Sequence, residues 1–255
     1  KETEMRILVA NDDGIYSPGI AALARAATKF GEVRVVAPDV EQSSAGHAIT
    51  ATRPVRYRRT QIFDDIDAYR VNGTPADCVA LGCYLWDHVD LVLSGINLGS
   101  NLGNATWHSG TLAAAKQGVL LGLRGIALSA PADEDDTTSF SALEPWVERT
   151  LSALVDLDEP RLINVNFPRE PRGIRWTAQA ADRYNGTVVP DTDPMGRKHF
   201  WFTVTPLEQP REGTDLWAVE QGYVSITPLR LDLTDHPELH RVVESMPWPD
   251  SAPTT

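Results

Sequence analysis

Residues 5–14 read MRILVANDDG, a short apolar segment that passes straight into Asn, Asp, Asp and Gly. The run Arg6 to Ala10 (RILVA) shows no apolar–polar alternation, which predicts a strand buried on both faces. Runs of the same kind recur along the first two thirds of the chain. They are Val33 to Ala37, Val89 to Ser94, Gly125 to Ser129 and Leu162 to Phe167, with a shorter candidate at Tyr69 to Val71.

Helical patterns separate these strands. Ser17-Pro18 places an N-cap residue before a proline at the first helical position. Thr74-Pro75-Ala76-Asp77 has the form of a capping box and opens a helix that runs to about Trp86. Ser109 to Leu121 and Ser141 to Val155 have helical patterns as well. Strands that alternate with helices predict an α/β fold with a mostly parallel, doubly wound sheet.

The last third of the chain has a different pattern. His199 to Thr205 and Tyr223 to Leu229 are predicted strands of a hairpin-rich extension, and Asp235 to Glu244 is a predicted closing helix. The expected organisation is a core at 5–185, then an extension at 186–246 with a hairpin, a returning strand and the helix. Residues 247–255 are expected to form a frayed tail, and Asp133 to Asp136 an acidic surface loop.

Composition narrows the classes of function. The 255 residues carry a formal net charge of −12, which argues against a partner such as duplex nucleic acid. No apolar stretch is long enough to span a membrane, and Lys1 to Met5 lacks the apolar region of a secretory signal. Cys78 and Cys83 lie five apart and face different sides of a helix, so they suit a reducing compartment. We therefore expect a cytoplasmic protein.

Small polar clusters follow the predicted strands, where ligands bind in doubly wound sheets. Asp12 and Asp13 are adjacent carboxylates that repel each other unless a cation holds them, and Asn97 and Ser43 add oxygen donors at the same edge. An all-oxygen set suits Mg²⁺, Mn²⁺ or Ca²⁺. The alternative is an ordinary turn, in which the aspartates cap the next helix and Gly14 supplies a positive φ.

A second cluster opens the helix that begins near Ser109. The free N–H groups of Ser109-Gly110-Thr111 at a helix N-terminus favour a phosphate group, although a simple Ser N-cap explains the same residues. His47 and His108 lie in loops at this edge and are either surface residues or groups that bind or protonate a leaving group.

The segments that carry these clusters resemble the SurE family. The resemblance runs from Met5 to about His240, through several separate motifs in the same order. The matching segments are Met5 to Ile15, Val36 to Asp39, Ser43 to His47, Gly73 to Cys78, Ser94 to Asn97, His108 to Thr111, Asn164 to Asn166 and Gly222 to Pro228.

The resemblance implies a metal-dependent phosphatase of nucleoside 5′- and 3′-monophosphates, some members of which also trim short polyphosphate. It implies a Rossmann-like three-layer sandwich with an extended C-terminal β-hairpin used in assembly of a homodimer or homotetramer. One divalent ion per subunit, Mg²⁺ or Mn²⁺ and Ca²⁺ in some crystals, would be held by Asp12, Asp13, Ser43 and Asn97.

We expect the catalytic residues to be Asp12, Asp13, Asn101, Ser109, Gly110 and Thr111. Asn11, His47 and His108 are the expected substrate-binding residues. The attacking group is either a water oriented by a carboxylate or a carboxylate itself.

Two other functions stay open at this point. One is a nucleotide-binding sensor that uses the same loops without turnover, and the other is a different metal-dependent hydrolase on the same fold. The chain has no G-x-S-x-G segment of a serine hydrolase and no G-x-G-x-x-G after the first strand.

Overall fold

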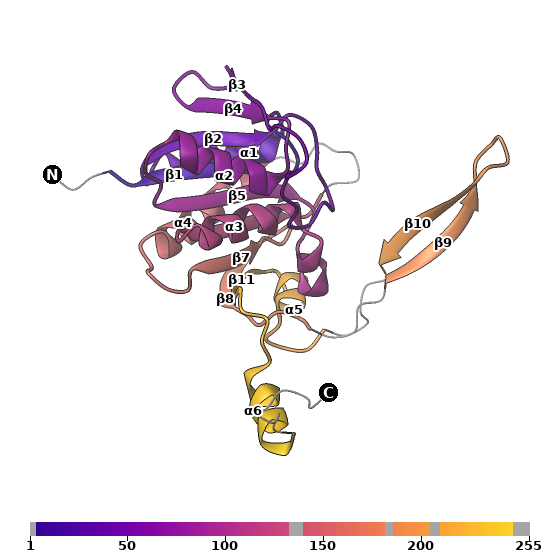
Figure 1. Cartoon of the computed structure of the whole chain (residues 1–255). Helices are drawn as coiled ribbons and strands as arrows, with labels where there is room; N and C mark the ends of the chain where they lie inside the picture. The colour runs from indigo at the N-terminus through magenta and orange to yellow at the C-terminus, as the bar shows by residue number, and fades with distance from the viewer. Residues whose placement is uncertain (1–3, 133–139, 182–185, 205–209, 247–255) are drawn as a thin grey trace, which may run out of the picture.

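The computed structural model describes residues 4–132, 140–181, 186–204 and 210–246 (Figure 1). The predicted acidic loop at Asp133 to Asp136 and the predicted tail at 247–255 lie outside the described residues.

A nine-stranded sheet forms the body of the molecule, in the order β3-β4-β2-β1-β5-β6-β7-β11-β8. The bounds are β1 Arg6–Ala10, β2 Glu32–Pro38, β3 Tyr57–Thr60, β4 Asp67–Val71, β5 Leu91–Leu98, β6 Arg124–Ala130, β7 Leu162–Asn166, β8 Gly173–Trp176 and β11 Tyr223–Leu229.

The centre of this sheet is parallel. From β4 through β2, β1, β5 and β6 to β7, every neighbouring pair runs in the same direction. Strand β1 lies between β2 and β5, with Val9 beside Val35 on one side and Leu93 on the other. Ile7, Leu8, Val9 and Ala10 are all fully buried, so both faces of β1 are covered, as the unbroken apolar run predicts.

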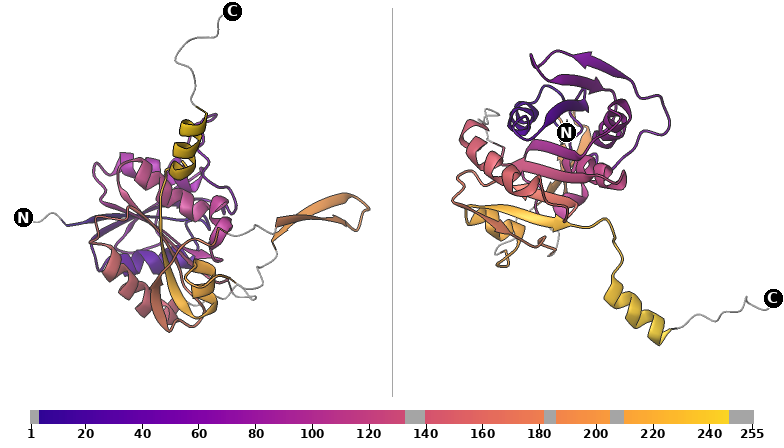
Figure 2. Two further views of the ribbon diagram at one scale, coloured as in Figure 1. Left: turned by 90° about the horizontal axis from the view of Figure 1, so that it is seen from below. Right: turned by 90° about the vertical axis from the view of Figure 1, so that its left-hand side faces the viewer.

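Helices cover both faces of the sheet and make three layers (Figure 2). Helices α1 and α4 pack on one face, and α2 and α3 pack together on the other. Their bounds are α1 Pro18–Ala27, α2 Pro75–Leu85, α3 Gly110–Leu120 and α4 Glu144–Leu154. Ser17 caps α1, and Thr74 forms the predicted capping box with Asp77 at the start of α2. The fold is a Rossmann-like α/β sandwich, as predicted.

One prediction for the last third is wrong. Tyr223–Leu229 (β11) does not belong to a hairpin-rich extension, because it lies inside the main sheet between β7 and β8. It runs antiparallel to β7, and its buried residues Val224 and Ile226 join the main core. The sequence pattern of β11 is that of a core strand, and only its distance along the chain from β7 suggested otherwise.

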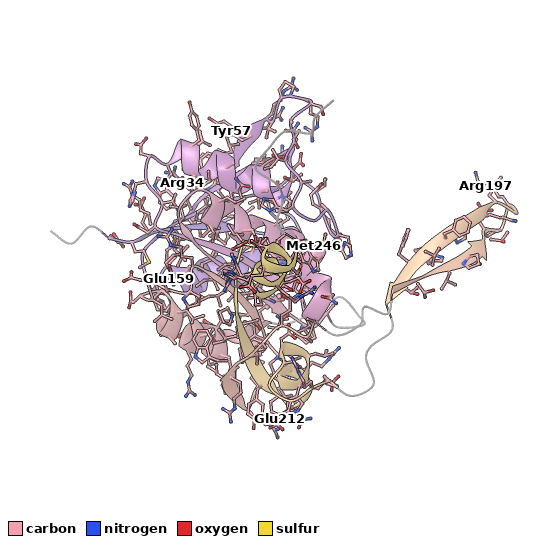
Figure 3. All side chains as sticks on the ribbon, turned by 60° about the horizontal axis from the view of Figure 1, so that its bottom comes forward. Arg34, Tyr57, Glu159, Arg197, Glu212 and Met246 are labelled. Carbon is pink, nitrogen blue, oxygen red and sulfur yellow. The ribbon has the colours of Figure 1, made fainter. Side chains whose placement is uncertain are left out.

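Two elements project from this body. Strands β9 (Gly186–Thr192) and β10 (Lys198–Val204) form a separate two-stranded hairpin that points away from the sheet, with Arg197 at its far end (Figure 3). Helix α6 (His236–Ser245) also stands clear of the body and has no buried residue (Figures 1 and 2). Among the described residues, no helix combines the length and apolar character that crossing a bilayer requires.

Candidate active site

Asp12 follows β1 and lies against the N-terminus of α3. The Thr111 hydroxyl donates a 2.6 Å hydrogen bond to Asp12 Oδ1, and the Thr111 backbone N–H also points to this carboxylate. Gly110 makes the approach possible, since a Cβ at this position would lie 2.8 Å from Asp12 Oδ2. The first turn of α3 therefore binds the Asp12 carboxylate, an anionic side chain of the same chain.

The burial of Asp12 changes the pKa of its carboxyl group. Only 4% of the residue is exposed, and this desolvation raises the pKa of its carboxyl group despite the hydrogen bonds from Thr111. The neighbouring charge of Glu41 raises this pKa further. Asp13 is less buried, and its Oδ2 accepts a hydrogen bond from the Leu98 backbone N–H at 3.3 Å.

The loop after β2 brings Ser43 to the same place. Gln42 N–H donates to the Asp12 carbonyl oxygen at 2.8 Å, and Gly46 N–H donates to the His108 carbonyl oxygen at 3.0 Å. These two bonds fix the loop between the end of β1 and the start of α3. The Ser43 hydroxyl donates to the Glu41 carboxylate at 2.6 Å, so Glu41 is a neighbour of the site that the sequence patterns did not indicate.

Asn97 lies near the end of β5, beyond an irregularity in that strand. The register between β5 and β6 shifts between Ser94 and Asn97, at Gly95, which has a φ of +129°. A side chain at 95 would collide with the Leu128 carbonyl oxygen, at 2.2 Å. The Asn97 amide donates to the Gly99 carbonyl oxygen at 2.5 Å, which leaves its own carbonyl oxygen as a candidate metal ligand.

Asn101 is held by a buried polar network that sequence reasoning missed. Its backbone N–H donates to Asn166 Oδ1 at 2.7 Å, and its carbonyl oxygen accepts from the Asn164 and Asn166 amides at 2.8 and 3.1 Å. Its side-chain amide donates to Ser129 at 2.9 Å and reaches Thr111 at 3.4 Å. The Asn-x-Asn spacing in β7 was the available signal, because it places two amides on one face of the strand.

A short 3₁₀ helix, η1 (Gly103–Trp107), connects Asn101 to α3 and is tied to a more distant part of the chain. The buried Asp215, at the start of α5 (Asp215–Glu220), accepts hydrogen bonds from the N–H groups of Gly103 at 2.8 Å and Ala180 at 2.9 Å. Burial raises the pKa of the Asp215 carboxyl group. Asp215 thus links the site loop to the segments that flank the hairpin.

The remaining predicted residues take different positions. Ser109 is the N-cap of α3 and accepts from Leu112 N–H at 3.0 Å, as the capping alternative predicts. Asn11 is fully buried, and its amide donates to the Gly14 carbonyl oxygen and the Ser17 hydroxyl, so it holds the turn beneath the site. His47 is exposed and pairs with Gln117 on α3 at 2.9 Å.

A cavity of about 690 Å³ opens over these groups. Its lining includes six of the predicted site residues, whereas Asn11, Asp13, His47, Gly110 and Thr111 are not part of it. The lining residues are Asp12, Ser43, Ser44, Asn97, Leu98, Gly99, Ser100, Asn101, Ala105, His108, Ser109 and Phe202. None of the residues described as lining the cavity is a lysine or an arginine.

The donor set fits a hard divalent cation. Two carboxylates, a hydroxyl and an amide oxygen are the ligand types that Mg²⁺ and Mn²⁺ accept. Among the described residues, no group of three or more His, Cys, Asp or Glu is placed for a metal, so Ser43 and Asn97 would have to complete any site built on Asp12 and Asp13. The buried Asp12 carboxylate next to Asp13 is also the kind of arrangement that a cation stabilises.

Comparisons with known proteins agree with this geometry. The sequence model of the family described as Survival protein SurE matches residues 7–186. "5′-nucleotidase SurE 1" of Thermus thermophilus is 50% identical over 237 residues, covering 91% of this chain and 94% of the relative. "5′-nucleotidase SurE" of Deinococcus radiodurans is 46% identical over 249 residues, covering 95% and 93%.

A solved structure extends the likeness to the fold. The crystal structure of the SurE protein from Aquifex aeolicus superposes with a TM-score of 0.78 at 39% identity, covering 94% of this chain and 98% of that one. Matches of this length and identity, together with the site just described, show that the chain belongs to the SurE family.

Proposed function

We propose that this chain is a divalent-metal-dependent phosphatase that hydrolyses nucleoside monophosphates to nucleoside and phosphate. The observation that carries the proposal is the lining of the cavity, which combines the Asp12 carboxylate, the Ser43 hydroxyl, the Asn97 amide and the Ser109 end of α3, with no basic side chain among the described lining residues. A phosphate dianion is repelled by Asp12 and by the adjacent Asp13 unless a cation lies between them. The printed names of the relatives point to the same substrate class.

In this mechanism Asp12, Asp13, Ser43 and Asn97 would hold one Mg²⁺ or Mn²⁺. When bound, the ion would neutralise the phosphoryl oxygens and lower the pKa of a coordinated water. Asn101 would hold the loop beside the phosphate group, since its own N–H groups donate to Asn166, Ser129 and Thr111, and the Ser109 hydroxyl and Gly110 N–H at the start of α3 would donate to the phosphate. Because Thr111 donates to Asp12, its part is to fix that carboxylate and keep it ionised. His108 lines the cavity next to Ser109, and in this proposal it would protonate the leaving oxygen.

The test is phosphate release by protein freed of metal with a chelator and then given Mg²⁺ or Mn²⁺. The substrates are 5′- and 3′-monophosphates and short polyphosphate, with p-nitrophenyl acetate as a carboxylic ester control. We expect release from the monophosphates only after metal is restored. Binding of AMP without phosphate release would indicate a sensor, and turnover of the ester alone would indicate another hydrolase. Full turnover in the chelated sample would exclude the metal-dependent mechanism.

We also propose that the protein assembles as a homodimer or homotetramer through its two projecting elements. The hairpin carries Phe200 and Trp201, each 59% exposed, on opposite faces. Leu239, Val243 and Met246 form an exposed apolar stripe along α6, at helical spacing. Exposed apolar surface of this extent on projecting elements is typical of subunit contacts.

A cytoplasmic location remains a proposal as well. Cys78 and Cys83 are free thiols, and burial raises the pKa of Cys78 well above its usual value and that of Cys83 to about 11. Unpaired, unreactive thiols fit a reducing compartment.

A further inference from the structure

The hairpin contributes a side chain to the cavity of the candidate site. Phe202, on β10, lines this cavity together with the loops after β2 and β5. Phe202 is 87% exposed, so little of this residue is covered by other parts of the chain. An uncovered phenyl ring at the edge of a polar cavity is costly unless a partner covers it in use.

The position of Phe202 is set by the register of the hairpin. Phe202 pairs with Val188 and Phe200 pairs with Pro190, so both rings lie on one face, while Trp201 lies on the other. Phe202 lies two residues from the end of β10 at 204, and Phe200 lies two residues nearer Arg197, which is at the far end of the hairpin (Figure 3). Of the three aromatic residues, Phe202 alone lines the cavity.

The cavity therefore has two chemically different parts. Asp12, Ser43, Asn97 and Ser109 form a part suited to a cation and a phosphate group. Phe202 and Leu98 provide apolar surface without hydrogen-bonding groups. The volume of about 690 Å³ is within the range of pockets that hold a whole small molecule.

We infer that Phe202 is the platform on which the nucleobase of the substrate stacks while its phosphate group lies at Asp12 and Ser109. This inference rests on the proposed nucleotidase function and adds a specificity-determining residue to it. Aromatic side chains bind bases through their π-faces, and every base has such a face.

The chemistry of this platform also predicts base preference. A phenyl ring has no donor or acceptor that reads the edge of a base, so Phe202 discriminates between bases by stacking area alone. Purine monophosphates should bind more tightly than pyrimidine monophosphates, and a phosphate ester without a base should bind most weakly. Adenine and guanine substrates should differ little from each other.

The experiment compares AMP, CMP and ribose 5-phosphate with wild type, Phe202→Ala, Phe202→Leu and Phe202→Trp, in the metal-loaded protein. Tyr84→Ala is the control, because it removes an exposed aromatic ring from α2, outside both the cavity and the projecting elements. The wild type should show a lower KM for AMP than for ribose 5-phosphate. In Phe202→Ala the KM for AMP should rise roughly tenfold, the size that loss of one base–aromatic stack predicts, with a smaller rise for CMP.

Ribose 5-phosphate, which has no base, distinguishes a failure of base stacking on Phe202 from a failure of the proposed phosphatase activity. The KM for ribose 5-phosphate should be the same in wild type and Phe202→Ala. For AMP, Phe202→Leu should recover little of the affinity lost in Phe202→Ala, and Phe202→Trp should recover most of it. An equal change for AMP and ribose 5-phosphate, no change for either, or a matching effect of Tyr84→Ala would overturn the platform and leave the phosphatase intact. Wild type that releases phosphate from none of the three substrates would instead contradict the proposed function.

Discussion

At the scale of single residues, the site depends on a carboxylate that is buried before any ligand arrives. Asp12 lies against Gly110 and accepts two hydrogen bonds from Thr111, yet burial still raises its pKa. The protein therefore maintains an unfavourable charge at the position where a cation would bind. Such a site has lower stability in the absence of its ligand, and this cost can be measured.

Asp12→Asn should make the metal-free protein more stable at neutral pH while removing most of its activity. The pKa of Asp12 in the folded protein is raised above the ordinary value of 3.8. Protonated Asp12 therefore adds to the free energy of unfolding, fully below pH 3.8, and this contribution is lost as the pH rises through the pKa of the folded protein. In chelator, the melting temperature of wild type should fall relative to that of the variant as pH increases from about 4 to 7. A constant difference across that interval would contradict the assignment.

Thr111→Val should weaken metal binding without emptying the site. The variant keeps the shape of threonine but removes the hydroxyl that donates to Asp12 at 2.6 Å. Loss of a hydrogen bond to a charged group is worth about 1.5–3 kcal/mol, which corresponds to at least a tenfold rise in the metal concentration for half-maximal activity. Thr111→Ser, which retains the hydroxyl, is the control and should behave as wild type. Equal metal requirements in Thr111→Val and wild type would show that this bond does not support the metal.

At the scale of elements, the N-terminus of α3 combines helix capping with a position at the cavity. Ser109 caps the helix, and the same turn faces the cavity. Helix α2 offers a comparison within the same chain, because Thr74 caps it in a similar way but does not line this cavity.

Ser109→Ala and Thr74→Ala should each reduce the stability of the protein by about 1 kcal/mol, the usual cost of losing a cap. Only Ser109→Ala should also lower kcat/KM for AMP and reduce the protection against heat that inorganic phosphate gives. The loss should be partial, because the backbone N–H groups of α3 survive the substitution. Steady-state kinetics and melting curves with and without phosphate measure both effects. Equal kinetics in the two variants would assign Ser109 to capping alone.

At the scale of the whole molecule, the body is a closed α/β sandwich, whereas the hairpin and α6 are not packed against it (Figure 2). Because these elements bury little surface against the body, contacts within the chain stabilise them little. We propose that their exposed apolar residues other than Phe202 contact neighbouring copies.

Replacing Leu239 and Val243 with glutamate should shift the particle to a smaller mass in light scattering at micromolar concentration. Both residues lie on the apolar stripe of α6, and burying two added charges in a contact would prevent it from forming. Glu244→Gln, on the polar side of the same helix, should leave the mass unchanged. A wild type that is already monomeric would contradict the proposed assembly.

Much of this organisation could be predicted from the sequence, because the relevant signals are local. Unbroken apolar runs predicted the parallel strands, and the polar residues directly after β1 and at the end of β5 predicted Asp12 and Asn97 at one edge. The spacing of Asn164 and Asn166 places both amides on one face of β7, but it does not identify Asn101 as their partner. Phe202 and Asp215 depend on how distant segments fold back, which no local pattern encodes.

The contacts of Asp215 predict that activity depends on protein concentration. This buried carboxylate joins Gly103, two residues after Asn101, to Ala180 and α5, which flank the hairpin on either side in the chain. A hairpin held by neighbouring copies would keep those flanking segments, and with them the Asn101 loop, in place. Activity per molecule should therefore fall when the protein is diluted below the concentration at which the assembly dissociates, and adding catalytically inactive Asp13→Asn protein should restore it.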